Sequence, residues 1–269
     1  MMTMTRRLAI NTPLMNVMIA AVEKASYRLR RDFGEVERLQ VSQKGPGDFV
    51  TVADTRTEKA LFEELKKARS KFGFLMEESG EVKGEDTNNR WVIDPIDGTT
   101  NFLHGIPHFC ISVALQRQHE ILAGVIYDPI KNELFYAEKG QGAFMNDIRL
   151  RVSGRRKLED SLLGVGGASI KRDTNEYYTY HQRVSPYVAS MRQSGSAALD
   201  LAYVAAGRFD AFFDTHLHPW DMAAGIILIR EAGGDVIDFK DNDTMMTTGS
   251  IIAANHDLCV ALKKILLNP

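Results

Sequence analysis

The most informative segment of the sequence is residues 91–102, which read Trp-Val-Ile-Asp-Pro-Ile-Asp-Gly-Thr-Thr-Asn-Phe. Pro95 lacks a backbone N–H and favours extended geometry at the residue before it, so we predict that Asp94 ends an apolar strand. Asp97 follows at the start of a Gly-Thr-Thr turn. Two carboxylates ~5 Å apart at an effective dielectric of ~20 repel by about 3 kcal/mol. A hard cation such as Mg²⁺ would remove this repulsion, and the turn amides beside it would suit a phosphate. A strand followed by an Asx-type turn explains the same residues without a metal.

Further acidic residues could join this pair. Glu77 and Glu78 follow the apolar run 72–76, which is typical of a strand that ends in a loop. Adjacent residues on an extended chain point opposite ways, so we expect Glu77 to face the site and Glu78 to lie in a solvated loop. Asp221 falls in the first turn of a helix predicted over 219–232, where the helix dipole is already a sufficient reason for an acid.

Three motifs in this order resemble the inositol monophosphatase family of Mg²⁺-dependent, lithium-sensitive phosphatases. They are Asp94-Pro-Ile-Asp97-Gly-Thr-Thr, Glu77-Glu78-Ser79 upstream of it, and Trp220-Asp221-Met-Ala-Ala-Gly downstream. The similarity runs from about Lys44 to Ala254 and is strongest to the bacterial branch, through residues 195–203.

Fold class follows partly from the residues and partly from the resemblance. Hydrophobic periodicity predicts helices that begin at Pro13, Thr55, Ala197, Pro219 and His256, and meandering strands over 109–136. This pattern alone gives an α+β chain with a largely antiparallel first sheet. The resemblance implies the layered α-β-α-β-α sandwich of the inositol monophosphatase and fructose-1,6-bisphosphatase type. We expect one compact unit of two lobes, with most metal ligands in 1–148 and the substrate alcohol side and Asp221 in 149–269.

The resemblance also implies a metal site and a water-activating group. Four acidic side chains in one cleft need about two divalent cations to offset their charge, and the family pattern implies two to three Mg²⁺. The implied metal ligands are Glu77, Asp94, the carbonyl of Ile96, Asp97 and Asp221. The implied catalytic residues are Asp54, Thr99 and Glu77, with Asp54 and Thr99 orienting the attacking water. From the residues alone, Asp54 could equally cap a helix that begins at Thr55.

Substrate contacts complete the implied site. The amides of Gly98 and Thr99 would bind phosphate oxygens, and the alcohol side would be lined by Gly195, Ser196, Ala197 and Asp214. Ser196 is also a good N-cap for the helix that follows it, and both roles can coexist.

These residues predict a Mg²⁺-dependent phosphatase that releases phosphate from myo-inositol monophosphates through attack by a metal-activated water. A sibling phosphatase for fructose 1,6-bisphosphate, a 3′-phosphoadenosine nucleotide or histidinol phosphate would share the same ligands and differ in the alcohol pocket. Bacterial relatives of this type also imply an additional, non-catalytic role with the transcription machinery. The resemblance further implies a homodimer.

Composition fits a cytoplasmic enzyme. The chain has 269 residues and a formal net charge of -2, so neither bulk nucleic-acid binding nor attraction to an anionic membrane is expected. No apolar run approaches a membrane span, and Arg6-Arg7 is not followed by a signal-peptide core. The two cysteines lie in apolar segments and predict buried thiols in a reducing compartment.

Overall fold

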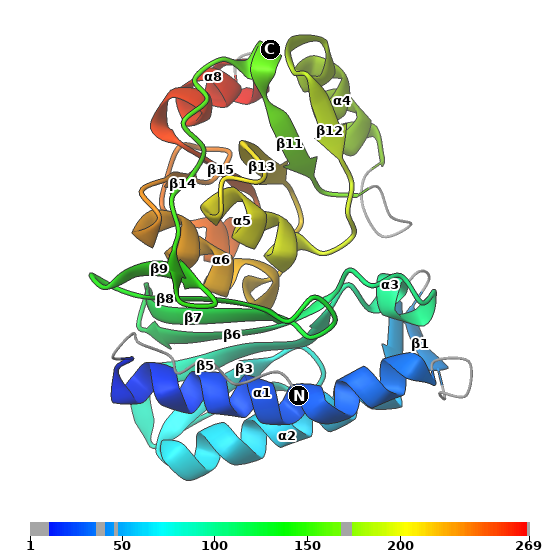
Figure 1. Cartoon of the computed structure of the whole chain (residues 1–269), viewed down its shortest axis with the longest axis vertical. Helices are drawn as coiled ribbons and strands as arrows, with labels where there is room; N and C mark the ends of the chain where they lie inside the picture. The colour runs from blue at the N-terminus through cyan, green and yellow to red at the C-terminus, as the bar shows by residue number, and fades with distance from the viewer. Residues whose placement is uncertain (1–10, 36–40, 46–47, 168–173, 268–269) are drawn as a thin grey trace.

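A computed structural model describes residues 11–35, 41–45, 48–167 and 174–267, which form alternating layers of helix and sheet (Figure 1). Helices α1 (Pro13–Gly34) and α2 (Val52–Ala68) cover the outer face of an eight-stranded sheet. Helices α5 (Ala197–Ala205) and α6 (Pro219–Glu231) lie between this sheet and a five-stranded one. Helices α4 (Thr174–Val184) and α8 (His256–Leu267) cover the far face of the smaller sheet. The predicted α-β-α-β-α order is confirmed.

The large sheet is antiparallel except where β3 runs parallel to β5. Its spatial order is β10-β9-β8-β7-β6-β5-β3-β4. The strands are β3 (Phe72–Met76), β4 (Gly80–Val82), β5 (Asp86–Asp97), β6 (Cys110–Arg117), β7 (Glu120–Asp128), β8 (Glu133–Glu138), β9 (Gly142–Met145) and β10 (Ile148–Arg149). The consecutive pairing of β6, β7 and β8 confirms the meander predicted over 109–136, and β5, β9 and β10 extend it on either side.

The smaller sheet mixes parallel and antiparallel pairs in the order β12-β11-β13-β15-β14. Its strands are β11 (Leu162–Val165), β12 (Ser190–Arg192), β13 (Ala211–Asp214), β14 (Asp235–Ile237) and β15 (Ile251–Ala254). The hairpin of β1 (Val41–Gly45) and β2 (Asp48–Thr51) and the short helices α3 (Thr99–Leu103) and α7 (Met245–Thr248) complete the strands and α-helices of the described residues.

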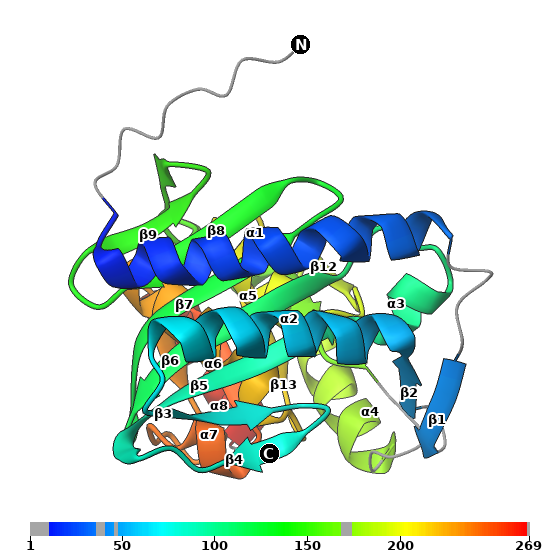
Figure 2. The same ribbon diagram turned by 90° about the horizontal axis from the view of Figure 1, so that it is seen from below.

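Helices α1 and α2 lie side by side across the large sheet (Figure 2), and each begins at a threonine cap. Thr12 accepts a hydrogen bond from the backbone N–H of Met15, one turn into α1. In α2 the cap is Thr51, and Asp54 occupies the third helical position and accepts a bond from the Thr51 N–H. The prediction that Asp54 caps a helix beginning at Thr55 is wrong, because this reciprocal capping box starts the helix three residues earlier.

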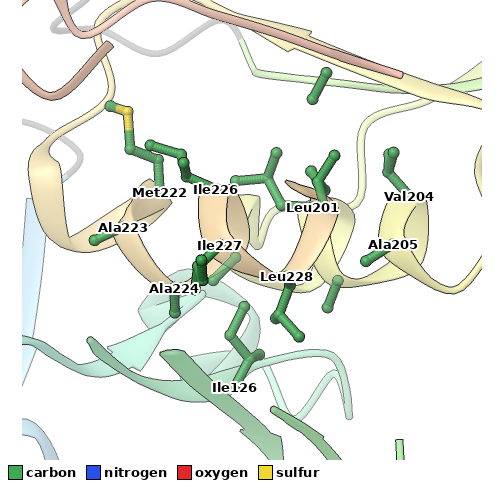
Figure 3. Packing of buried hydrophobic residues seen from close by; sticks show 14 of the residues in the cluster. Ile126, Leu201, Val204, Ala205, Met222, Ala223, Ala224, Ile226, Ile227 and Leu228 are labelled. Atoms are coloured by element: carbon green, nitrogen blue, oxygen red, sulfur yellow. The ribbon is translucent and has the colours of Figure 1, made fainter. Parts of the chain in front are cut away.

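Helix α6 lies at the centre of the molecule, because α5 and α6 together form the layer between the two sheets (Figure 3). Every residue from Met222 to Ile229 is buried, and the cluster around it includes Leu201 of α5 and Ile126 of β7. Each of the large apolar side chains in this run, such as Ile226 and Leu228, contributes about 1.5–3 kcal/mol on burial. This packing holds Asp221, at the start of α6, rigidly in place.

Because α5 and α6 pack against the large sheet, both sides of the predicted lobe boundary share one core. The division into 1–148 and 149–269 therefore stays a proposal, and residues 1–10 of its first lobe lie outside the described ranges. None of the helices in the described part of the chain combines the length and hydrophobicity that a membrane span requires.

Candidate active site

Asp94, Asp97 and Asp221 form an acidic cluster where β5 ends and α6 begins. One carboxylate oxygen from each lies within 4.8 Å of the other two. Side chains alternate across a strand, so residues three apart would normally face opposite sides. The register with β6 shifts between Asp94 and Asp97, as in a β-bulge. Pro95 lies within this shift and cannot donate a hydrogen bond to the neighbouring strand. The irregularity lets the carboxylates of Asp94 and Asp97 reach the same cluster.

Backbone and side-chain donors hold each acid of the cluster. Asp94 Oδ1 accepts a hydrogen bond from the N–H of Ile96 (3.0 Å), and Asp221 Oδ2 accepts one from the N–H of His218 (2.8 Å). The second bond is the capping interaction expected for an acid in the first turn of a helix, so Asp221 both caps α6 and faces the other acids. The structural and functional interpretations of this residue are therefore compatible.

Glu77 joins the cluster from the neighbouring strand. It follows β3, the parallel partner of β5, and its N–H donates to the carbonyl of Ile93 at 3.2 Å. Its carboxyl group lies against that of Asp94, to which it is hydrogen-bonded. The loop after it is held by Glu58, whose side chain accepts bonds from the Glu78 N–H and the Ser79 hydroxyl. Glu77 is thus the member of the Glu pair that the structure brings to Asp94.

Burial and mutual repulsion perturb the ionisation of the cluster. Burial raises the pKa of Asp94 well above its usual range, and the charges of Glu77, Asp97 and Asp221 raise it further. Burial and the Asp97 charge likewise raise the pKa of Asp221 well above normal. Three desolvated carboxyl groups, with the half-buried Glu77 beside them, offer the hard oxygen ligands that suit a divalent cation such as Mg²⁺.

Asp54 and Thr99 meet beside this cluster. The Thr99 hydroxyl lies 3.2 Å from Asp54 Oδ1 and 3.0 Å from the carbonyl oxygen of Ile96. The second Asp54 oxygen accepts bonds from the N–H and the hydroxyl of Thr51. Burial raises the pKa of Asp54, and the bonds from Thr51 and Thr99 oppose that shift. Asp54 therefore belongs to the capping box of α2 and also contacts Thr99 beside the acidic cluster.

A cavity of about 380 Å³ opens next to the acids. The described residues around it include Asp97, Asp221, Gly195, Ser196, Ala197 and Asp214. The turn that begins at Gly98, whose φ is 99°, contributes Thr100 and Asn101 to the wall. The four residues predicted for the alcohol side therefore all border this cavity. The Ser196 hydroxyl, however, donates to Asp97 Oδ2 at 2.6 Å.

Comparison with known proteins identifies the family. The model of the inositol monophosphatase family matches residues 10–266. The chain belongs to this family. It is 54% identical over 257 residues to the inositol-1-monophosphatase of Mesorhizobium japonicum, covering 95% of this chain and 97% of that one. It is 43% identical over 251 residues to Nus factor SuhB of Escherichia coli, covering 93% and 94%. The crystal structure of extragenic suppressor protein suhB from Bartonella henselae matches with a TM-score of 0.93 and 52% identity, over 96% of this chain and 99% of that one.

Two features of this inositol monophosphatase fold escaped the sequence analysis. A Cβ atom at Gly166 would lie 1.9 Å from Cγ of Asp214, so glycine is needed there for the Asp214 side chain to fit. The glycines at positions 164, 166 and 167 were the available signal. Asp200 also borders the cavity and is 1% exposed. Its Oδ1 lies 3.9 Å from Nε2 of His108, and neither atom has a hydrogen-bond partner among the described residues.

A larger cavity, of about 530 Å³, lies at the opposite ends of β5 and α6. Its charged residues pair with one another, as Arg230 does with Asp243 (2.6 Å) and Arg90 with Glu81 (3.4 Å). We assign the family's active site to the smaller cavity because the acidic cluster borders it.

Proposed function

We propose that this protein is a Mg²⁺-dependent phosphatase that hydrolyses myo-inositol monophosphates. The observation that carries the proposal is the cluster of Asp94, Asp97 and Asp221 within 4.8 Å, beside the Asp54–Thr99 contact and the cavity. The M. japonicum relative named inositol-1-monophosphatase supports the same reaction.

Two sets of ligands would each hold one Mg²⁺. Glu77, Asp94 and the carbonyl of Ile96 would hold one Mg²⁺, and Asp94, Asp97 and Asp221 a second. A third, weaker site would use Glu77 and water. When bound, Mg²⁺ would offset the carboxylate charge, attract the phosphate dianion, and favour both water ionisation and departure of the alkoxide.

Asp54 and Thr99 would orient the attacking water. The Thr99 oxygen would accept a hydrogen bond from the water while its own proton turns to Asp54 Oδ1 in place of the Ile96 carbonyl, so that the proton of the water would be drawn toward Asp54. Glu77 would hold the water from the other side. The amides of Gly98 and Thr99 would donate to phosphate oxygens, which gain charge during the reaction.

The alcohol would lie against Gly195, Ser196, Ala197 and Asp214. Asp214 Oδ1 already accepts the N–H of Thr215 at 2.7 Å, which fixes the carboxylate so that it can accept substrate hydroxyl groups. Fructose 1,6-bisphosphatase, 3′-phosphoadenosine nucleotide phosphatase and histidinol phosphatase activities are the alternatives, since they would differ only at this wall.

A phosphate-release panel tests the proposal. The purified chain is assayed with inositol 1-phosphate, fructose 1,6-bisphosphate, a 3′-phosphoadenosine nucleotide, histidinol phosphate and an aryl phosphate, with Mg²⁺ or with a chelator. We expect Mg²⁺-dependent release and the highest kcat/KM for inositol 1-phosphate. A higher kcat/KM for another member of the panel would show that this compound, and not inositol 1-phosphate, is the preferred substrate. Phosphate release that persists in the chelator would overturn the metal role.

The remaining proposals concern partners and location. We propose a cytoplasmic homodimer with no membrane or direct nucleic-acid partner. The relative named Nus factor SuhB is consistent with an additional role with the transcription machinery. Binding of a catalytically inactive Asp97→Asn variant to purified RNA polymerase tests that role apart from catalysis, and light scattering tests the dimer.

A further inference from the structure

We propose that Ser196 positions Asp97 for metal binding, an inference that rests on the proposed metal-dependent function. The resemblance assigned Ser196 to the substrate alcohol. The geometry points to a role one step further from the substrate, in which the Ser196 hydroxyl fixes the orientation of an acidic ligand.

Two donors from the start of α5 converge on one oxygen of Asp97. The Ser196 hydroxyl donates to Asp97 Oδ2 at 2.6 Å, and the N–H of Ala198 donates to the same atom at 2.7 Å. Asp97 is 9% exposed and Ser196 is 2% exposed. Short bonds from a hydroxyl and an amide to a buried carboxylate are stronger than bonds between neutral groups. Together they set the plane of the Asp97 carboxylate.

The hydroxyl proton of Ser196 is committed to this bond. Ser196 Oγ accepts the N–H of Leu199 at 3.4 Å, which is the helix-capping interaction. The Ser196 hydroxyl therefore accepts a hydrogen bond from α5 and donates its single proton to Asp97. The thiol of Cys110 lies next to this pair, with its sulfur 3.8 Å from Ser196 Oγ and 3.9 Å from Asp97 Oδ2.

Fixing Oδ2 determines where the rest of the carboxylate points. Asp97 must present an oxygen close to those of Asp94 and Asp221, which come from another part of β5 and from α6. Ser196 and Asp97 are 99 positions apart in the chain, so the bond also ties the start of α5 to the end of β5. Groups that orient metal ligands in this way commonly change metal affinity 10–100-fold when they are removed.

Glycine and threonine at position 196 separate this role from helix capping. Glycine is a fair N-cap but has no hydroxyl, whereas threonine keeps both functions. We expect Ser196→Gly to weaken Mg²⁺ binding roughly tenfold or more and Ser196→Thr to restore most of the affinity. Binding is measured by calorimetry on the full chain and by the rise in Tm as Mg²⁺ is added, neither of which needs turnover. Thr12→Gly, at the cap of α1, is the matched control and should lower Tm without changing Mg²⁺ affinity.

Activity assays separate positioning from substrate contact. In Ser196→Gly, kcat/KM at limiting Mg²⁺ should fall by the same factor for inositol 1-phosphate and for an aryl phosphate, and excess Mg²⁺ should recover most of it. Wild-type Mg²⁺ affinity in Ser196→Gly, or a loss confined to inositol 1-phosphate, would overturn the positioning role. A wild-type chain that binds Mg²⁺ but releases no phosphate would instead refute the proposed function, and the calorimetric comparison would still decide the role of Ser196.

Discussion

The Thr99 hydroxyl lies 3.2 Å from Asp54 Oδ1, although the two residues are 45 positions apart in the chain. Asp54 belongs to the first turn of α2, and Thr99 opens α3 just after β5. The Thr51 bonds fix Asp54 from the opposite side. The contact therefore joins a rigid helix start to the turn that follows the acidic cluster, and it defines one place where a water can be oriented.

We expect Thr99→Ala to reduce kcat roughly 100-fold, because general-base assistance typically contributes 10²–10⁴-fold. Mg²⁺ affinity should change little, since the hydroxyl is not a proposed ligand. Thr99→Ser keeps the hydroxyl and should retain most of kcat. Steady-state kinetics at saturating Mg²⁺ provides the check, and near-normal kcat in Thr99→Ala would exclude the residue from water activation.

Asp97→Asn and Asp221→Asn should each abolish most Mg²⁺-dependent turnover while leaving the fold intact. A neutral amide attracts a hard cation less than a carboxylate does. Both residues also have a carboxylate oxygen that accepts protein donors, and an amide oxygen can still accept them. Circular dichroism checks the fold, and a Mg²⁺ titration of turnover checks the ligand role. If either variant works normally at low Mg²⁺, that residue is not a ligand.

Asp214→Ala should lower turnover of inositol 1-phosphate much more than that of an aryl phosphate. Asp214 borders the cavity where the substrate alcohol is proposed to bind, and an aryl phosphate has no ring hydroxyl groups to bind there. The measured quantity is the ratio of kcat/KM for the two substrates. Equal losses for both would show that Asp214 serves the structure or the metal site.

Local signals predicted much of the fold. The strand over 72–76 matches its predicted limits, helices α1 and α8 begin at Pro13 and His256 as predicted, and Ser196 is the expected helix cap. These features depend on neighbours in sequence. The start of α2 was misplaced because Thr51 and Asp54 are both good caps and act together, so residue preference alone cannot choose the first turn.

Contacts between distant segments were beyond local reasoning. Ser196 reads as a helix cap in sequence, and only the packing of α5 against β5 directs its hydroxyl to Asp97. Similarly, Gly166 reads as part of a glycine-rich loop, and the need for glycine becomes clear only when Asp214 is seen against it. The residue types of the site could be predicted from motifs, whereas their mutual orientation could not.

Asp200→Asn should stabilise the protein at neutral pH. Burial raises the pKa of Asp200 well above its usual range, and the charges of Asp97 and Asp214 add to this shift, whereas a bond from Ser194 opposes it. Burial lowers the pKa of the facing His108, so that ring supplies no compensating charge at neutral pH. A carboxyl whose pKa is raised on folding stabilises the fold below its unfolded pKa, and that stabilisation is lost as pH rises through the folded pKa.

The Tm of Asp200→Asn should therefore exceed that of the wild type at pH 7–8, and the difference should vanish as pH falls to about 4. Each kcal/mol corresponds to roughly 2–4 °C in a chain of this size. Thermal melts in a chelator, with the exposed Asp160→Asn as control, measure the effect. A Tm difference that is constant between pH 4 and pH 8 would show that the gain does not come from the ionisation of Asp200.

Lithium should inhibit at millimolar concentration, and Mg²⁺ should show an optimum. Li⁺ is close to Mg²⁺ in size but carries half the charge, so it suits the same hard oxygen ligands yet offsets less negative charge. We expect it to compete for the position formed by Asp94, Asp97 and Asp221, best after the ester is cleaved and while phosphate is still bound. Excess Mg²⁺ should retain phosphate in the same way. Inhibition should then persist or grow at saturating inositol 1-phosphate. Steady-state rates over a lithium series at low and saturating substrate provide the measurement, and relief of inhibition by substrate would exclude binding after cleavage.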